Sequence, residues 1–159
     1  QPVNAIPPRA WARMQLRYSV GVDPDTLIPK LRAFLDRQGF PNVRIELSRE
    51  AMFRASRIDP HHPWVQWAAR SIERTTQIEA AILPSLGGSL PNDVFTEVLK
   101  LPTLWVPHSY PASANHAPNE NVPVAVLREG LGIMAGLYWD LGEPEARGLA
   151  AHPVPIDTR

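Results

Sequence analysis

The chain has 159 residues, of which 44% are hydrophobic and 20% charged, a composition typical of a soluble globular protein with one full domain or two small ones. Lys+Arg and Asp+Glu both number 16, which excludes a global electrostatic attraction to nucleic acid or to an anionic membrane. Because the sequence contains no cysteine, disulfides, thiolate catalysis and thiolate-bound zinc are excluded, and we expect a cytoplasmic protein.

No stretch of the sequence is apolar enough to span a bilayer, which takes about 18 consecutive apolar residues, and none has the pattern of a signal peptide. The chain opens with Gln1 rather than methionine, so we expect a fragment, a processed product or a trimmed chain. Its 18 prolines are spread along the sequence and divide it into short elements.

The first third of the chain predicts a β-α-β unit. Residues 10–20 alternate polar and apolar side chains, the pattern of a half-buried strand, and residues 43–48 repeat this alternation. Between them, Asp23 and Pro24 are typical of a helix start, and an apolar face predicts a helix that stops at Gly39. This sheet has too few strands to be stable alone, so we expect it either to pair its edges with another copy or to be poorly ordered.

The remainder of the chain predicts alternating helices and short apolar strands. Helices are expected over residues 64–77, 92–100 and 122–141, and strands over residues 79–83 and 103–106. This alternation favours an α/β fold with a layered sheet, in which loops at the carboxyl ends of strands carry the site. The turn at Gly87 and the loop at His116 both follow predicted strands, and we expect them to meet at one edge of the sheet.

Two loops and one strand carry the candidate site residues. His116 with Glu120 forms a possible metal or catalytic site, although a lone loop histidine is more often solvated or capping. The turn at Gly87 and Gly88 could direct main-chain N–H groups at an anion, or be an ordinary strand-to-helix turn. Arg17 could clamp a carboxylate or simply be solvated.

Two further histidine positions carry weaker signals. His61 and His62 stand between prolines and predict a solvated turn rather than a metal pair. His108, close to the His116 loop, is a possible second polar group for that site.

Three motifs follow one another in the chain, and together they resemble the co-catalytic zinc amidohydrolase family. They are Asn4-Ala5-Ile6-Pro7 leading into Leu16-Arg17-Tyr18, then Gly87-Gly88-Ser89-Leu90-Pro91, then His116-Ala117-Pro118-Asn119-Glu120. That family includes acetylornithine deacetylase, succinyl-diaminopimelate desuccinylase, carnosine dipeptidases and glutamate carboxypeptidase. The resemblance implies an incomplete α/β catalytic sheet with helices, plus half of a two-layer α+β lid that also forms the dimer.

On this resemblance the chain divides into four parts. Residues 1–52 correspond to a partial lid or dimerisation domain, residues 53–63 to a linker, residues 64–142 to the C-terminal part of the catalytic domain, and residues 143–159 to a flexible tail. The resemblance also implies a homodimer formed through the lid strands and helix.

The resemblance implies a role for each site residue. His116 would bind one of two zinc ions, with Asn119 and Glu120 bracing its loop. Asn4 would contact the tetrahedral intermediate. The substrate carboxylate would be held by four residues, Arg17, Gly87, Gly88 and Ser89. The substrate would be a small peptide or an N-acyl amino acid, hydrolysed at its amide bond.

The sequence departs from the family by lacking most of its zinc ligands and its general base. One histidine cannot hold catalytic zinc, which needs about three protein ligands. We therefore expect the chain by itself to be inactive and to bind little or no zinc. The alternative is a non-catalytic dimerisation or ligand-binding module.

Overall fold

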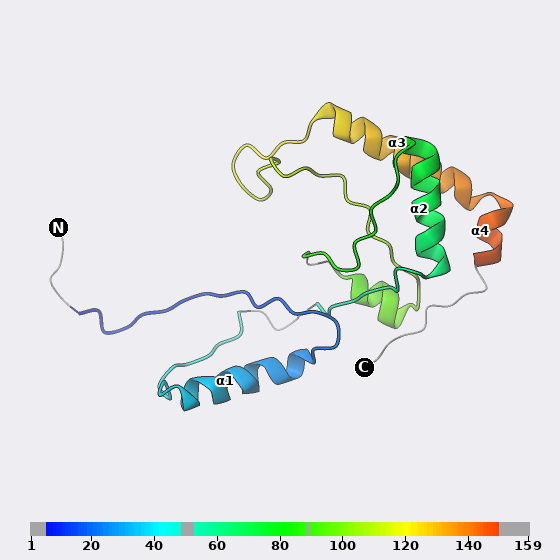
Figure 1. Cartoon of the computed structure of the whole chain (residues 1–159). Helices are drawn as coiled ribbons and strands as arrows, with labels where there is room; N and C mark the ends of the chain where they lie inside the picture. The colour runs from blue at the N-terminus through cyan, green and yellow to red at the C-terminus, as the bar shows by residue number, and fades with distance from the viewer. Residues whose placement is uncertain (1–5, 49–52, 89, 150–159) are drawn as a thin grey trace.

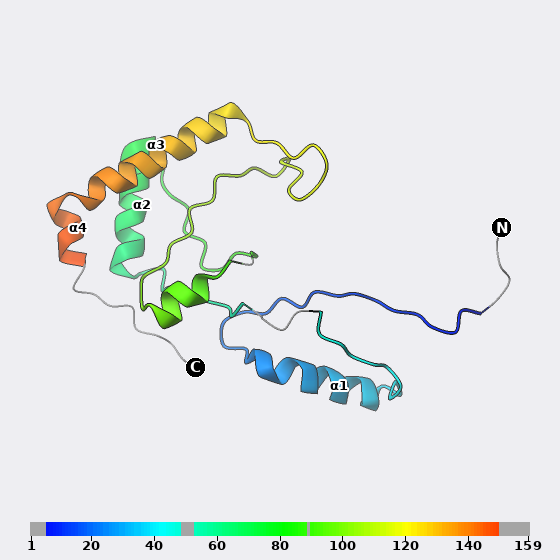
Figure 2. The ribbon, with the colours of Figure 1, turned by 180° about the vertical axis from the view of Figure 1, so that it is seen from behind.

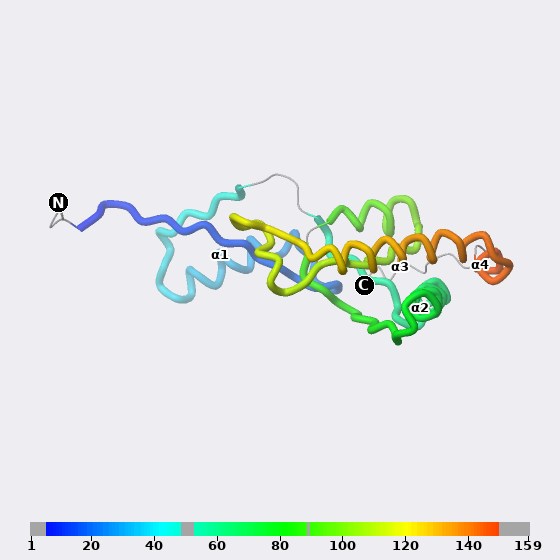
Figure 3. Tube along the Cα trace, turned by 90° about the horizontal axis from the view of Figure 1, so that it is seen from above, coloured from blue at the N-terminus to red at the C-terminus, as the bar shows by residue number. Residues whose placement is uncertain are grey.

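The computed structural model of the chain describes residues 6–48, 53–88 and 90–149. Its elements, in chain order, are η1 (Pro24–Thr26), α1 (Leu27–Arg37), α2 (Pro63–Thr76), the π-helical turn η2 (Val94–Val98), α3 (Val124–Leu141) and α4 (Pro144–Leu149). Helices α2, α3 and α4 gather at one end, whereas α1 and the extended N-terminal segment lie apart from them (Figures 1 and 2). Seen from above, α4 and the N-terminal segment mark opposite ends of an elongated molecule (Figure 3).

The predicted α/β fold is wrong, because the described ranges contain helices and irregular segments but no strand or sheet. Residues 10–20, 43–48, 79–83 and 103–106 run as irregular chain, and no ladder of backbone hydrogen bonds joins any two of these segments. A strand is defined by such pairing, which period-two alternation within one segment cannot supply. The catalytic sheet and the two-layer lid are therefore both absent from the part of the chain that the structure describes.

The apolar side chains of the N-terminal segment are exposed rather than covered by a second layer. Trp11 and Met14 are 87% and 79% exposed, and Leu16 is 63% exposed. Met14 and Leu16 stand at alternate positions of the pattern and Trp11 on its other side, and in the described part of the chain no second layer packs against them. The half-buried strand predicted from this alternation is therefore wrong.

The predicted helices are confirmed, because their signals are local. The Asp23 carboxylate accepts a hydrogen bond from the Asp25 N–H at 3.0 Å, and Pro24 opens the irregular first turn η1. Helix α1 ends before Gly39, whose φ of +84° suits a residue without a side chain. Arg32 of α1 ties the returning chain to the helix by donating to the Phe40 carbonyl at 2.9 Å and to the Val43 carbonyl.

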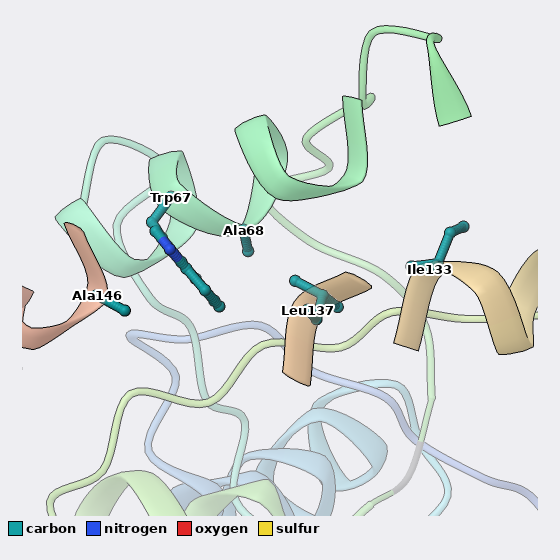
Figure 4. Close-up of a cluster of buried hydrophobic side chains, with 5 residues drawn as sticks. All are labelled: Trp67, Ala68, Ile133, Leu137 and Ala146. Atoms are coloured by element: carbon teal, nitrogen blue, oxygen red, sulfur yellow. The ribbon is translucent and has the colours of Figure 1, made fainter. Parts of the chain in front are cut away.

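The core lies where α2, α3 and α4 meet, and Figure 4 shows its five buried hydrophobic side chains. Trp67 extends from α2 into the space between Ala146 of α4 and Leu137 of α3 (Figure 4). Its ring meets that of Trp64 edge to face, with centroids 5.4 Å apart, an arrangement that aromatic quadrupoles favour. Because Ala146 is 4% exposed, α4 anchors the first residues of the expected C-terminal tail.

Helices α2 and α3 approach closely where Gly136 faces Thr75. A β-carbon at Gly136 would overlap the Thr75 hydroxyl and lie 3.3 Å from its β-carbon, so a larger residue there would have to displace the Thr75 side chain. Beside this contact, Arg74 of α2 pairs with Asp140 of α3 at 2.7 Å. The Ser71 hydroxyl and the Arg74 guanidinium hold the pKa of the Asp140 carboxyl below its ordinary value.

Helix α3 is apolar on more of its circumference than the core covers. Gly130, Ile133 and Leu137 are its buried residues. A second stripe stays exposed, formed by Val124, Leu127, Leu131 and Tyr138 at 61%, 47%, 73% and 71%. Among the described helices, none combines the length and apolar character required to cross a membrane.

Candidate functional site

Arg17 and the glycine turn come together although they are 70 residues apart in the chain. A β-carbon at Gly87 would lie 3.5 Å from the Nη1 atom of Arg17, so the guanidinium borders the main chain there. Arg17 makes one weak hydrogen bond, to the Gln15 side chain at 3.4 Å, and no ion pair with any described acidic residue. Its charge therefore remains available to a ligand.

The other glycine of the turn lies under an aromatic ring. A β-carbon at Gly88 would overlap the six-membered ring of Trp105, lying 2.6 Å from its Cζ3 atom. Trp105 nevertheless stays 44% exposed, because the turn covers only part of its indole. Gly87 and Gly88 are thus bordered by a guanidinium at the first residue and by an indole at the second.

These residues line an open cavity of about 430 Å3, a volume within the range of small-molecule sites. Three arginines contribute to its lining, namely Arg17, Arg54 and Arg57, and no described aspartate or glutamate does. Much of the remaining wall is apolar, with Leu83, Leu86 and Leu104 among its residues. A concave site with cations and apolar walls suits a small organic anion.

Of the three cavity arginines, Arg54 already has acidic groups beside it. Arg54 pairs with Asp25 at 3.8 Å, and its main-chain N–H donates to the Asp93 carboxylate at 3.2 Å. The Tyr18 hydroxyl donates to the Phe53 carbonyl at 2.9 Å, and burial raises its pKa above the ordinary value, with Arg54 opposing the effect. Tyr18 is therefore neutral at pH 7, and Arg17 and Arg57 are the cavity arginines without an ion pair to any described acidic residue.

His116 lies in a tightly turned loop at some distance from that cavity. The loop residues Ala114, His116 and Asn119 all have left-handed backbones, with φ of +54°, +63° and +65°. The Asn121 N–H closes the loop by donating to the Ser113 carbonyl at 3.0 Å. The His116 side chain is exposed. Left-handed backbone at non-glycine residues is uncommon and costs free energy, so this shape is imposed by the surrounding contacts.

The side chains that brace the His116 loop are those of Asn121 and Tyr110. Asn121 donates from its amide to the Asn119 carbonyl at 2.8 Å and accepts a hydrogen bond from the Tyr110 hydroxyl. No side-chain hydrogen bond of Asn119 or Glu120 occurs within the described ranges. Sequence reasoning singled out those two residues and missed Tyr110, which lies outside the motif.

Beside this loop is a second cavity of about 320 Å3, lined by polar residues that include His108, Glu120 and Asn121. The His108 ring packs against α3 at Gly130, where a β-carbon would lie 2.8 Å from the ring. The segment after Trp105 links the cavities, since Pro107 lines the first and His108 the second. The glycine turn and the His116 loop thus border two separate cavities rather than one sheet edge.

The residues described here do not fit a catalytic zinc centre. No three His, Asp or Glu side chains come together to hold a metal ion in the described ranges, and the sequence has no cysteine. His116 therefore contributes at most one of the three or so protein ligands that catalytic zinc needs.

Two predicted site residues, Asn4 and Ser89, lie outside the described residues. His62, predicted to lie in a solvated turn, is buried, and its Nδ1 accepts a hydrogen bond from the Trp64 N–H at 3.3 Å at the start of α2. Trp105 was also missed, because an aromatic residue in a predicted strand is expected in the core.

Comparison with protein families, with curated proteins and with solved structures found no match to this chain.

Proposed function

We propose that this chain is the carboxylate-binding part of a zinc-dependent amidohydrolase that cleaves a dipeptide or an N-acyl amino acid. Arg17 and the main chain at Gly87 and Gly88 hold the substrate's carboxylate, and His116 provides one zinc ligand. The other ligands and the general base come from residues beyond those described.

The observation that carries this proposal is the position of Arg17 beside Gly87. Among the described residues Arg17 has no acidic partner and no aspartate or glutamate lines its cavity, so this arginine beside glycine main chain is suited to an incoming carboxylate. The ordered motifs of the sequence support the same assignment, since they associate these two residues with one substrate group.

A titration of the chain with N-acetylated amino acids tests carboxylate binding. The chain should bind N-acetyl-L-leucine and bind its carboxamide at least about tenfold more weakly, because a charge-assisted hydrogen bond contributes about 1.5–3 kcal/mol. Equal dissociation constants for the acid and the amide would overturn carboxylate binding at this site.

Hydrolysis is tested separately. With zinc added, the chain should hydrolyse dipeptides or N-acyl amino acids no faster than its His116→Ala variant. Turnover by the unmodified chain well above that of the variant would contradict the expectation that other residues complete the site.

The second candidate is a non-catalytic module that pairs with another copy. The exposed apolar side chains of the N-terminal segment favour it, since contiguous apolar surface of this kind marks interaction sites. Sedimentation of the chain and of a Met14→Glu variant tests this function. A dimer that the substitution dissociates supports it, and a monomer at all concentrations contradicts it.

A further inference from the structure

We infer that Trp105 sets the class of ligand at this site, which is an amino-acid carboxylate with an apolar or aromatic side chain. This inference rests on the proposed function for the position of the carboxylate, and adds the identity of the neighbouring group.

The geometry of the glycine pair carries the inference. Arg17 borders Gly87, Trp105 borders Gly88, and both side chains line the same cavity. A ligand in this cavity whose carboxylate meets Arg17 therefore has the indole of Trp105 in the same cavity for contact with its own side chain.

The environment of Trp105 decides which side chain suits it. With the residue 44% exposed, part of the indole remains free for contact, and apolar leucines line the same cavity. Offset stacking or edge-to-face contact with an aromatic side chain stabilises such a pair beyond the area that it buries. A glycine ligand leaves this surface in water, and an acidic side chain there loses hydration without a matching donor from the indole face.

The test is a calorimetric titration of the unmodified chain with three probes, N-acetyl-L-phenylalanine, N-acetylglycine and N-acetyl-L-aspartate. We expect the phenylalanine derivative to bind about tenfold more tightly than the glycine derivative, and the aspartate derivative no better than glycine. Equal binding of the first two, or tightest binding of the aspartate derivative, would overturn the inference while leaving carboxylate binding intact. Failure of all three to bind would overturn both the inference and the proposed function.

Substitutions at Trp105 test whether this residue causes the preference for N-acetyl-L-phenylalanine over N-acetylglycine. Trp105→Ala should reduce the preference for phenylalanine over glycine to less than about twofold. Trp105→Phe retains an aromatic face and should keep most of the preference, which guards against a loss of folding in the alanine variant. Trp139→Ala is the matched control, since Trp139 is an exposed tryptophan of α3 that does not line the cavity. A preference that survives both Trp105 substitutions in full would contradict the assignment.

Discussion

The Nη1 atom of Arg17 lies 3.5 Å from the position that a β-carbon at Gly87 would occupy. This contact joins the N-terminal segment to the turn before η2, and it places a guanidinium that has no ion pair within the described residues beside the main chain of Gly87. The neighbouring residue differs in one respect, since the space above Gly88 is filled by Trp105. The two glycines consequently predict different effects of the same substitution.

Gly87→Ala should leave the fold intact and weaken carboxylate binding. At 3.5 Å the added methyl group makes ordinary van der Waals contact with Arg17, but it takes space that a carboxylate oxygen needs. We expect an unchanged melting temperature and about tenfold weaker binding of N-acetyl-L-leucine by calorimetry.

Gly88→Ala should instead displace Trp105 and alter tryptophan fluorescence. Unchanged binding in the first variant, or an unchanged spectrum in the second, would count against the geometry.

Two glycines of α3 form a matched pair for the packing of α2 on α3. Gly132→Ala meets open space and should stabilise the protein by about 0.5–1 kcal/mol through helix propensity. Gly136→Ala forces a methyl group into Thr75, and overpacking costs about 1–3 kcal/mol, so this variant should be the less stable one. Denaturant titration compares them, and equal stabilities would show that the helices do not approach as described.

Asp140 should make stability depend on acid pH. Its pKa is lowered by Ser71 and Arg74, so its contribution is present above the ordinary value of about 3.8 and is lost as pH falls through the lowered value. Asp140→Asn should be less stable at pH 7, by about 1 kcal/mol for a partly exposed pair, and should lose less stability below pH 4. Glu143→Gln, at a residue without an ion pair in the described ranges, is the control. Identical acid unfolding of all three proteins would contradict the assignment.

The brace of the His116 loop predicts a local effect. Tyr110→Phe removes the hydroxyl that donates to Asn121, and the left-handed loop should then open more often. Hydrogen exchange should accelerate at the amides of Ala117 and Asn121, which are hydrogen-bonded within the loop, while exchange in α2 stays unchanged. Tyr138→Phe, on the exposed stripe of α3, is the control. Unchanged exchange in the loop would show that Tyr110 does not hold it.

The helices could be predicted from the sequence because their signals are contained in short segments. Asp23, Pro24 and Gly39 fix the limits of the first helix by their own backbone preferences, whatever surrounds them. Pairing of strands depends instead on residues far away in the chain, and the alternation around Met14 gives no information about a partner. The predicted sheet failed for this reason.

The residues of the candidate site also differ in whether a local sequence signal could identify them. Arg17 and the glycine turn were singled out separately, and only the resemblance to the zinc amidohydrolase family gave them a shared role, which no local pattern indicated. Trp105 could not be assigned, because its ring packs against Gly88, a residue well separated from it in the chain. Tyr110 was missed since its bond to Asn121 spans 11 residues of loop with no regular period.

The most direct test of carboxylate binding compares two arginines of the N-terminal segment. Arg17 lines the cavity, whereas Arg13 lies four residues earlier and does not. Calorimetric titration with N-acetyl-L-leucine should show binding weakened at least about tenfold in Arg17→Gln and unchanged in Arg13→Gln, as expected for loss of one charge-assisted hydrogen bond. Equal affinities in the two variants would contradict the central claim that Arg17 and Gly87 form a carboxylate site.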